Sequence, residues 1–362
     1  MTNKKTNVIF ILPSLAAGGA ERVMSYIAQN INNQKYNVTL VVIGFKKDNA
    51  FEVNNIEVKY LNKPRVVTSI VDCVFLFKRL KPKIVVSALS NLNAYMGYIS
   101  ILFPKCKFIG REVNIGSVLK DHPEENNRYY PSFINKYGYK GLDYIICQSQ
   151  DMYSDALNHP NLKNHNLVVI NNPITKSFNV KKSTSNQSPN RTYKFITVGS
   201  LERRKGHLRI LKVLSEIKDI DFQYIIIGRG SQKENIFSKI AELNIEDKII
   251  HIPFTNNVAK YLSESDVFLQ GSFVEGFPNA LIESCAVGTP AVVFDAPGGI
   301  NEIIQDDVNG FIVNSEKGFK NKILKAISKA WDPQIIHNSV FEKYNSKTIL
   351  KKYEELFDSC LT

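Results

Sequence analysis

The sequence lacks several features that would assign a chain of 362 residues to a class at once. No apolar run approaches the roughly 18 residues that a membrane-spanning helix needs. The run Val8–Leu12 follows two lysines, but it is shorter than the roughly 7 to 15 residues of a secretory signal core, which favours a buried strand. The five cysteines lie far apart, without metal-ligand or redox-motif spacing, so we expect free thiols in a reducing cytoplasm.

Patterns for metal and nicotinamide chemistry are also missing. The six histidines form no H-E-x-x-H group, and no G-x-G-x-x-G follows an apolar run. Asp219-Ile220-Asp221 matches a D-x-D metal motif, but it precedes a predicted strand and would lie at the end where ligands do not bind. We therefore expect no metal and no resident cofactor.

Lys and Arg exceed Asp and Glu by 12, so the surface should attract anions. A nucleic acid, a phosphorylated small molecule and an acidic membrane surface all fit this charge. The basic residues form no recognisable nucleic-acid-binding module, so we expect no nucleic-acid partner.

One apolar segment, Val66–Phe77, runs into four cations: Lys78, Arg79, Lys81 and Lys83. A helix of this kind docks on anionic lipid in some proteins. It also suits a crossover helix buried against a sheet, which is the interpretation we favour. Contact with an anionic membrane stays open.

Short apolar runs alternate with helical patterns along most of the chain, as in parallel sheets covered by helices on both faces. The predicted strands are Val8–Leu12, Val38–Ile43, Ile84–Ala88, Phe108–Gly110, Tyr144–Cys147, Leu167–Ile170, Tyr193–Val198, Phe222–Ile227, Ile249–Ile252, Val267–Gln270, Ala291–Phe294 and Phe311–Val313. Residues 175–190 are polar and without periodicity, which indicates a linker. The fold class is thus α/β, with two Rossmann-like doubly wound domains facing a cleft, over residues 1–174 and 191–340.

Several loops after predicted strands suit phosphate. Gly18-Gly19 precedes a helix, whose N-terminus favours an anion. Arg203-Arg204-Lys205 follows another strand and suits a diphosphate. The loops Gly228-Arg229-Gly230 and Pro297-Gly298-Gly299 are compatible with phosphate but equally with ordinary turns.

The segment Ser272–Pro290 carries the most information. A helix is predicted from about Asn279, as its cap, to Val287, with Gly288 as its stop. Glu275 lies on the loop before this helix, and Glu283 lies one turn into it. Because a carboxylate accepts two hydrogen bonds at a time, such a loop can hold a sugar, a diphosphate and a ribose together.

This segment resembles the retaining glycosyltransferases of family 4, also called glycosyl transferases group 1, which have the GT-B fold. Glu275 and Glu283 reproduce the family's E-x7-E pattern within E-G-F-P-N-A-L-I-E. The likeness extends to Gly18-Gly19-Ala20-Glu21-Arg22, to Asn172-Pro173-Ile174 and to Lys205-Gly206, so it covers nearly the whole chain.

The resemblance implies a role for each matching residue. Lys205 would bind the donor diphosphate, Glu275 would hold the transferred sugar, and Glu283 would bind the ribose. The catalytic residues are then Glu275 and Lys205. The donor-binding residues are Gly19, Arg203, Arg204, Gly228, Phe277, Pro278, Asn279, Ala280 and Glu283. A final helix, about Ser346–Leu356 within residues 341–362, would return to the first domain.

The chain departs from the family at two places. Ser200 stands where an Arg often completes the diphosphate clamp, and Arg203 or Arg204 could replace it. Gly110–Asn114 stands where many relatives carry a His near the acceptor. The candidates on the acceptor side are Asn91, Arg111 and Asn114, with Ser90 and Asn93 beside the first of them.

The implied activity is transfer, with retained configuration, of a hexose or N-acetylhexosamine from a nucleotide-diphosphate donor, most often UDP-linked. The acceptor would be a glycan or a lipid-linked oligosaccharide in surface polysaccharide synthesis. A catalytically silent partner subunit that binds nucleotide sugars is the main alternative, because its loops would look the same. The expected location is the cytoplasm, with the inner face of the membrane left open.

Overall fold

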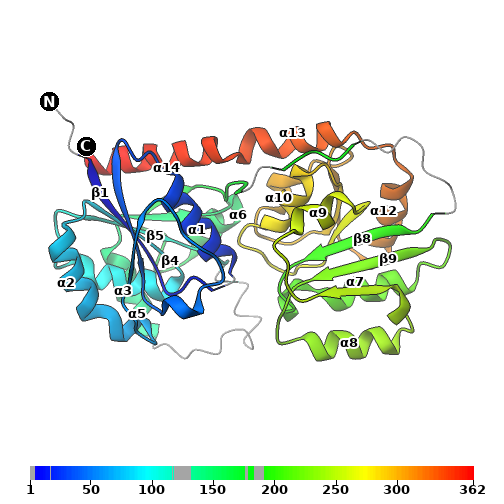
Figure 1. The fold of residues 1–362 in the computed structure, drawn as a ribbon, viewed down its shortest axis with the longest axis horizontal. Coiled ribbons are helices and arrows are strands. Elements are labelled where there is room, and N and C mark those ends of the chain that lie inside the picture. Colours follow the sequence, from blue (N-terminus) through cyan, green and yellow to red (C-terminus); the bar gives the residue numbers. More distant parts are fainter. Residues whose placement is uncertain (1–4, 17, 116, 118–131, 176–177, 183–190) are drawn as a thin grey trace. The chain divides into compact units, whose positions relative to one another are not determined.

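The computed structural model describes residues 5–16, 18–115, 117, 132–175, 178–182 and 191–362 (Figure 1). Of these, the residues up to Thr175 and those from Ser346 onward form one compact unit, the first unit. The described residues between them, up to Asn345, form the second unit.

The first unit contains a seven-stranded parallel sheet in the order β3-β2-β1-β4-β5-β6-β7. Its strands are β1 Thr6–Leu12, β2 Tyr36–Val42, β3 Glu57–Tyr60, β4 Ile84–Ala88, β5 Lys107–Arg111, β6 Tyr144–Cys147 and β7 Asn166–Val169. Its helices are α1 Gly19–Asn30, α2 Ile70–Leu80, α3 Ser90–Ser100, α5 Ser132–Gly138, α6 Gln150–Asn158 and α14 Ser346–Leu361, with the 3₁₀ turns η2 Val66–Ser69 and η4 Tyr139–Gly141. The strand order reverses between β1 and β4, and ligands of such sheets bind beyond the carboxyl ends of the strands at this point.

Alternate residues of β1 enter different cores because both faces of the sheet are covered. Phe10 packs with α1 and α14 on one face, whereas Ile9 and Ile11 pack with α2 and α3 on the other. The ring of Phe357 in α14 lies 6.2 Å from Phe10 and 5.5 Å from Tyr36. The last helix of the chain is therefore part of the first unit's core, and it extends five residues beyond the predicted end at Leu356.

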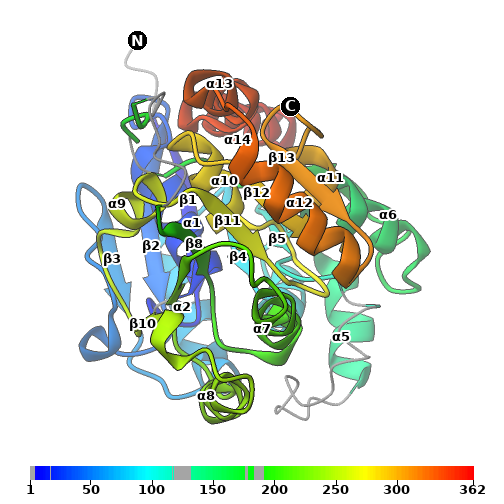
Figure 2. The ribbon, with the colours of Figure 1, turned by 90° about the vertical axis from the view of Figure 1, so that its right-hand side faces the viewer.

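The second unit contains a six-stranded parallel sheet in the order β10-β9-β8-β11-β12-β13. Its strands are β8 Tyr193–Val198, β9 Phe222–Ile227, β10 Ile249–Ile252, β11 Val267–Gln270, β12 Ala291–Phe294 and β13 Gly310–Val313. Its helices are α7 His207–Ser215, α8 Lys233–Glu242, α9 Val258–Ser263, α10 Asn279–Ala286, α11 Ile300–Ile303, α12 Glu316–Ser328 and α13 Pro333–Tyr344, with the 3₁₀ turns η5 Arg203–Lys205 and η6 Glu246–Lys248. Figure 2 shows α7 and α8 on one side of this sheet and α9, α10 and α13 on the other.

The predicted linker is only partly described, because residues 176–177 and 183–190 lie outside the described ranges. Within 178–182, the Lys181 amide donates to the carbonyl of Val287, and its ammonium donates to the carbonyl of Ser265, both at 2.9 Å. This stretch is thus held on the second unit. The boundary expected at residue 340 falls inside α13, so the second unit ends at Asn345 instead.

No helix in the described parts of the chain is both long and apolar enough to cross a bilayer.

Candidate active site

Glu275 lies between β11 and α10, at the carboxyl edge of the second unit's sheet, and its side chain is almost fully buried. The Lys205 ammonium donates to both carboxylate oxygens at 2.7 Å. The Ser272 hydroxyl donates to Oε1 at 2.5 Å, and Nη1 of Arg204 lies 4.0 Å from Oε2. The loop after β8 therefore supplies two cations to a carboxylate from the loop after β11.

The charge state of Glu275 follows from these neighbours. Burial by itself raises the pKa of a carboxyl group, because it disfavours the charged form. The charges of Lys205 and Arg204, together with the hydrogen bonds from Lys205 and Ser272, more than offset this effect and lower the pKa of Glu275 below its ordinary value. The carboxylate is thus ionised at neutral pH and can accept hydrogen bonds from sugar hydroxyls.

Glycines allow the loops around Glu275 to come this close. Gly206 has a positive φ of 62°, and a Cβ on it would stand 1.7 Å from the carbonyl oxygen of Gly271. A Cβ on Gly298 would stand 2.2 Å from the carbonyl oxygen of Glu275. The Glu275 amide in turn donates to the carbonyl oxygen of Pro297 at 2.9 Å. Since no larger residue fits, the loops after β8, β11 and β12 are fixed against one another by backbone contact.

Arg209 of α7 is a residue of this site that the sequence did not reveal. Its Nε donates to the carbonyl of Gly271 at 2.6 Å, and its Nη2 donates to the carbonyl of Ser272. The guanidinium lies 4.1 Å from the ring centre of Phe273 and 3.8 Å from that of Phe294. Burial lowers its pKa to about 10, which leaves it charged at neutral pH. Arg209 thus holds the backbone that leads to Glu275.

The N-terminus of α10 lies directly after Glu275. Its cap is Pro278, with Asn279 as the first helical residue, so the cap predicted at Asn279 is wrong by one position. Because the first amides of a helix have no partner within it, this end favours an anion. Glu283 lies in the same helix and is 6% exposed. The Phe277 ring is buried and contacts Tyr344, so only its backbone is available to a ligand.

The two arginines before Lys205 lie in different surroundings. Arg204 is the one beside Glu275, whereas Arg203 lines a cavity of about 320 Å³ along α7. His207, which follows, is buried, and its Nε2 is 3.0 Å from the carbonyl of Ser200. Burial lowers the pKa of His207, which favours the neutral ring that braces this loop.

Gly228 brings the loop after β9 against the loop after β8. A Cβ on it would stand 1.9 Å from the carbonyl oxygen of Gly199. Its amide donates to the carbonyl of Ile252 at 2.9 Å, and the Leu201 amide donates to Arg229 at 2.8 Å. Close backbone packing thus explains why a glycine is needed at position 228. Its role in binding a ligand stays a prediction.

In the first unit, Gly19 is the first residue of α1, at the carboxyl edge beside the strand-order reversal. Gly18 caps this helix without a side-chain hydrogen bond. A Cβ on Gly18 would stand 2.0 Å from Oε2 of Glu21, whose pKa is raised by burial. The glycine therefore lets the Glu21 carboxyl fold back over the start of α1.

The acceptor-side candidates divide into buried and accessible residues. Asn91 and Asn114 are half-buried and lie near the carboxyl ends of β4 and β5. Arg111 has no exposed surface, and its Nη2 donates to Asn172, so the side chain lies inside the unit. It also lies beside Tyr353: burial raises the pKa of that phenol, and the Arg111 charge opposes the change. Arg111 supports this edge from within.

Glu112 is the second residue of interest that the sequence did not single out by itself. Its Oε1 accepts hydrogen bonds from Asn93 at 2.8 Å and from Tyr139 at 2.6 Å, and its Oε2 accepts one from Ser90 at 2.9 Å. Leu89, just before α3, has a φ of 80°, which is unusual for a residue with a Cβ and marks strained backbone. Asn93 is fully buried and thus supports Glu112, while Ser90 remains half-buried at the edge.

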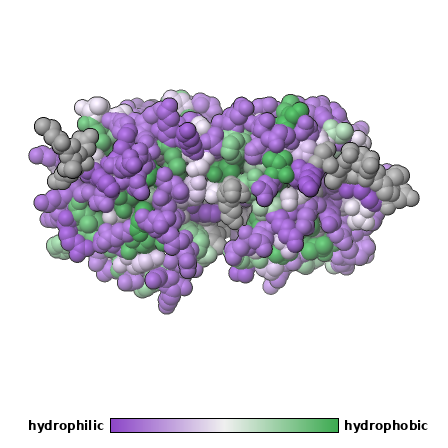
Figure 3. All heavy atoms as spheres, turned by 45° about the horizontal axis from the view of Figure 1, so that its top comes forward, coloured by the Kyte–Doolittle hydropathy of each residue, from purple (hydrophilic) through white to green (hydrophobic). Residues whose placement is uncertain are grey.

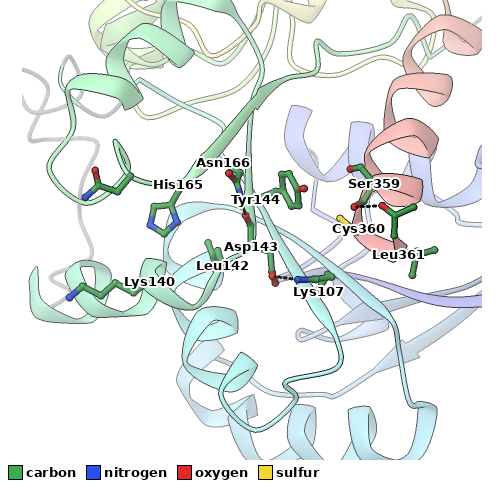
Figure 4. A pocket seen from close by; sticks show the side chains of 12 residues that line it. Lys107, Lys140, Leu142, Asp143, Tyr144, His165, Asn166, Ser359, Cys360 and Leu361 are labelled. Atoms are coloured by element: carbon green, nitrogen blue, oxygen red, sulfur yellow. Dashed lines mark hydrogen bonds and ion pairs between the residues drawn. The ribbon is translucent and has the colours of Figure 1, made fainter.

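A hollow of about 620 Å³ in the first unit lies at the opposite, amino edge of the sheet (Figure 4). Lys107, Asp143 and Asn166, near the starts of β5, β6 and β7, line it together with Cys360 of α14. Lys107 donates to Asp143 at 2.8 Å. This hollow is therefore separate from the carboxyl edge of its own sheet, where the candidate residues lie.

Comparison with known proteins gives consistent relatives. Residues 179–347 match the family described as Glycosyl transferases group 1. A Campylobacter jejuni protein is 25% identical over 363 residues, which cover 96% of this chain and 95% of its own: N-acetylgalactosamine-N,N'-diacetylbacillosaminyl-diphospho-undecaprenol 4-alpha-N-acetylgalactosaminyltransferase. An uncharacterized glycosyltransferase of Haemophilus influenzae is 29% identical over 310 residues, or 84% of each chain.

Solved structures share the fold. The lipopolysaccharide outer core galactosyltransferase WaaB, in its apo form, is 19% identical with a TM-score of 0.75, over 98% of this chain and 99% of its own. HepE of Anabaena, in complex with UDP and glucose, is 17% identical with a TM-score of 0.76, over 98% and 100%. The two parallel-sheet α/β domains of the GT-B kind are thus confirmed. Since they contain the Glu275–Glu283 segment, residues 179–347 belong to the glycosyl transferases group 1 family, and the chain is a glycosyltransferase.

Proposed function

We propose that this glycosyltransferase moves a hexose or N-acetylhexosamine, with retained configuration, from a UDP-linked donor to a glycan or lipid-linked oligosaccharide. The observation that carries this proposal is the buried pair of Glu275 with Lys205 at the carboxyl edge of the second unit. It places one fixed negative group and two cations beside the N-terminus of α10, as a sugar joined to a diphosphate requires.

The cations would take the diphosphate. The side chains of Lys205 and Arg204 are 19% and 22% exposed, so both can reach a ligand while Glu275 stays buried. The backbone N–H groups of Asn279 and Ala280, where α10 begins, would add hydrogen bonds to the same anion. Glu275 would accept hydrogen bonds from the sugar hydroxyls. In this arrangement Arg204, rather than Arg203, replaces the family arginine missing at Ser200.

The chemistry needs no protein nucleophile. The acceptor hydroxyl oxygen bonds to the anomeric carbon while the bond from that carbon to the diphosphate oxygen breaks. The departing phosphate oxygen takes the hydroxyl proton, so attack and departure share one face of the sugar and its configuration is kept. Lys205, Arg204 and the α10 N-terminus stabilise the charge that develops on the diphosphate, and the proposal therefore includes no metal.

The remaining roles follow the positions of the residues. Glu283 would accept hydrogen bonds from the ribose, and the Gly19 amide would contact the phosphates. On the acceptor side, Asn91 and Asn114 would bind hydroxyl groups at the carboxyl edge of the first unit. Ser90 joins them, because its hydroxyl already donates to Glu112 and its oxygen can accept from an acceptor.

The proposed substrates rest on the relatives. The Campylobacter jejuni relative is named for transfer of N-acetylgalactosamine to a sugar on diphospho-undecaprenol. A protein of Erwinia amylovora, 21% identical over 94% of this chain, is named for amylovoran biosynthesis. These names support a surface polysaccharide or lipid-linked acceptor, and the UDP bound to HepE supports the base. The five cysteines, all buried and free, support work in the reducing cytoplasm.

The test is nucleotide release from a panel of UDP- and GDP-sugars, with a chelator present and a lipid-linked acceptor extract added. Release that needs both one donor and the extract would support a metal-independent transferase and identify its sugar. If the folded protein binds a donor but releases no nucleotide with any acceptor extract, the silent-subunit alternative is favoured. Release that occurs only when the chelator is left out would contradict the metal-independent part of the proposal.

A further inference from the structure

The helix α2 and the 3₁₀ turn before it carry an apolar stripe that faces solvent. Val67, Val71 and Phe75 stand four residues apart, on one side of the helix, and they are 48%, 63% and 68% exposed. The opposite side of α2 buries Cys73 and Phe77 against the sheet. The packing of the helix in the first unit is thus complete without the stripe.

Two more exposed apolar side chains follow the neighbouring helix α3. Ile101 and Leu102, directly after α3, are 74% and 60% exposed. The next residue, Phe103, has its ring 5.8 Å from that of Phe77 in α2, and α2 contacts α3. We name the five exposed residues Val67, Val71, Phe75, Ile101 and Leu102 the α2 surface. Figure 3 shows apolar side chains gathered among polar ones on the unit that carries the N-terminus.

Exposed cations border the α2 surface. Arg65 precedes the stripe, and Lys78, Arg79 and Lys81 follow it. The acidic residue within α2, Asp72, is paired with Lys63 at 3.1 Å. The surface is thus apolar at its centre and positive at its rim, and long cationic side chains can keep their charge at a polar boundary while their stems lie on apolar groups.

We propose that the α2 surface docks the protein on a bilayer that contains anionic lipid. Its apolar side chains would enter the boundary between headgroups and acyl chains, and the rim cations would contact lipid phosphates. A second copy of the chain fits less well, because a symmetric contact would place two positive rims against each other. The turn Val66–Ser69 follows β3 at the carboxyl edge of the first sheet. The acceptor is proposed to bind at this same edge.

This inference deepens the lipid-linked part of the proposed function and rests on it for its purpose, but its test involves no sugar. The full chain is sedimented with vesicles of phosphatidylcholine alone and with vesicles that also contain phosphatidylglycerol. We expect binding to the anionic vesicles to be stronger by about tenfold or more, and to weaken as salt is added.

Three variants complete the test. Phe75→Ser should lower binding to anionic vesicles by about tenfold, because it removes the most exposed aromatic of the stripe. The double change Lys78→Glu with Arg79→Glu should lower it and remove most of its salt dependence. Ile335→Ser changes an apolar side chain that is 54% exposed in the second unit and should bind as the parent does. Melting curves check that each variant is folded.

The outcomes decide the proposal in either direction. No vesicle binding by the parent chain, equal binding to both vesicle types, or equal effects of Phe75→Ser and Ile335→Ser would overturn it. A dimer in sedimentation velocity that Phe75→Ser disperses would assign the surface to a second copy and would also overturn it. None of these results depends on sugar transfer, so a failure here is distinguishable from a failure of the proposed function.

Discussion

At the scale of single residues, Glu275 combines two properties that rarely occur together, burial and a full negative charge. The ion pair with Lys205, the hydrogen bond from Ser272 and the nearby charge of Arg204 fix the carboxylate before any ligand binds. Preorganised charge of this kind is effective in catalysis because it needs no rearrangement when the transition state forms. The residue is therefore expected to matter more for transfer than for holding the donor.

Replacing Glu275 tests this expectation. Glu275→Ala should lower the rate of sugar transfer by about a hundredfold or more while UDP still binds. Glu234→Ala, which changes an exposed carboxylate of α8 in the same unit, should leave the rate unchanged. The measurements are initial rates of nucleotide release and UDP affinity by calorimetry. A folded Glu275→Ala enzyme with a normal rate would remove Glu275 from the proposed site.

The lowered pKa of Glu275 predicts an acid dependence of stability. A carboxyl group with a lower pKa in the folded state stabilises the fold fully above its unfolded pKa, near 4.5, and loses this contribution as the pH falls through its folded pKa. Glu275→Gln should therefore lower the free energy of unfolding by about 1 to 3 kcal/mol at neutral pH and by less in acid. Urea titrations at neutral pH and below 4.5 check this. An equal effect of the change at both pH values would contradict it.

Arg209 is expected to position the site without touching substrate. Arg209→Lys keeps the charge but cannot bind both carbonyls of Gly271 and Ser272 through one planar group. We expect kcat to fall by about tenfold with a smaller change in KM, because the geometry around Glu275 loosens. Lys212→Arg, on the exposed side of α7, is the matched control. A kcat equal to that of the parent would show that the loop holds its form without Arg209.

At the scale of elements, the strands of the second unit could be predicted because each is a continuous, mostly apolar run, including the edge strand β10. β8, β9, β10, β11 and β12 have the bounds that their apolar runs indicated. β3 was missed. It is a four-residue edge strand, and its Glu57 and Lys59 alternate with Val58 and Tyr60, so no continuous apolar run marks it.

The candidate site was predictable only in part, for a related reason. Glu275, Lys205 and the start of α10 follow apolar strands, so the topology alone brings them to one edge. Arg209 and Glu112 act through contacts with residues that are distant in the sequence, and nothing in their local spacing distinguishes them from ordinary surface residues. Which of Arg203 and Arg204 lies beside Glu275 likewise depends on the backbone of one 3₁₀ turn, which the sequence pattern does not determine.

The packing of α14 can be tested at the same scale. Phe357 contacts Phe10 and Tyr36 and has no exposed surface, so Phe357→Ala leaves a cavity in the first unit's core. We expect the change to lower the free energy of unfolding by about 3 to 5 kcal/mol. Phe341→Ala, at a ring that is 43% exposed in α13, should cost much less. Calorimetric melting of both variants checks this, and similar losses would mean that α14 does not support the core.

At the scale of the whole molecule, two units with separate cores should respond differently to ligand. If UDP binds the second unit, it stabilises that unit by about 2.7 kcal/mol at a hundred times its Kd. We therefore expect UDP to raise the melting temperature of one transition, and Lys205→Ala to remove most of the shift. Scanning calorimetry with and without UDP measures it. A shift that survives in Lys205→Ala would place the nucleotide away from Lys205.

The return of the chain to its first unit has a consequence for biosynthesis. Residues Ile349, Tyr353 and Phe357 complete a core that β1 and α1 begin, yet they are made only after the whole second unit. This face of the first sheet therefore stays uncovered until α14 has left the ribosome. The second unit has all its strands earlier and can fold first, which reverses the usual order of domain folding from the N-terminus.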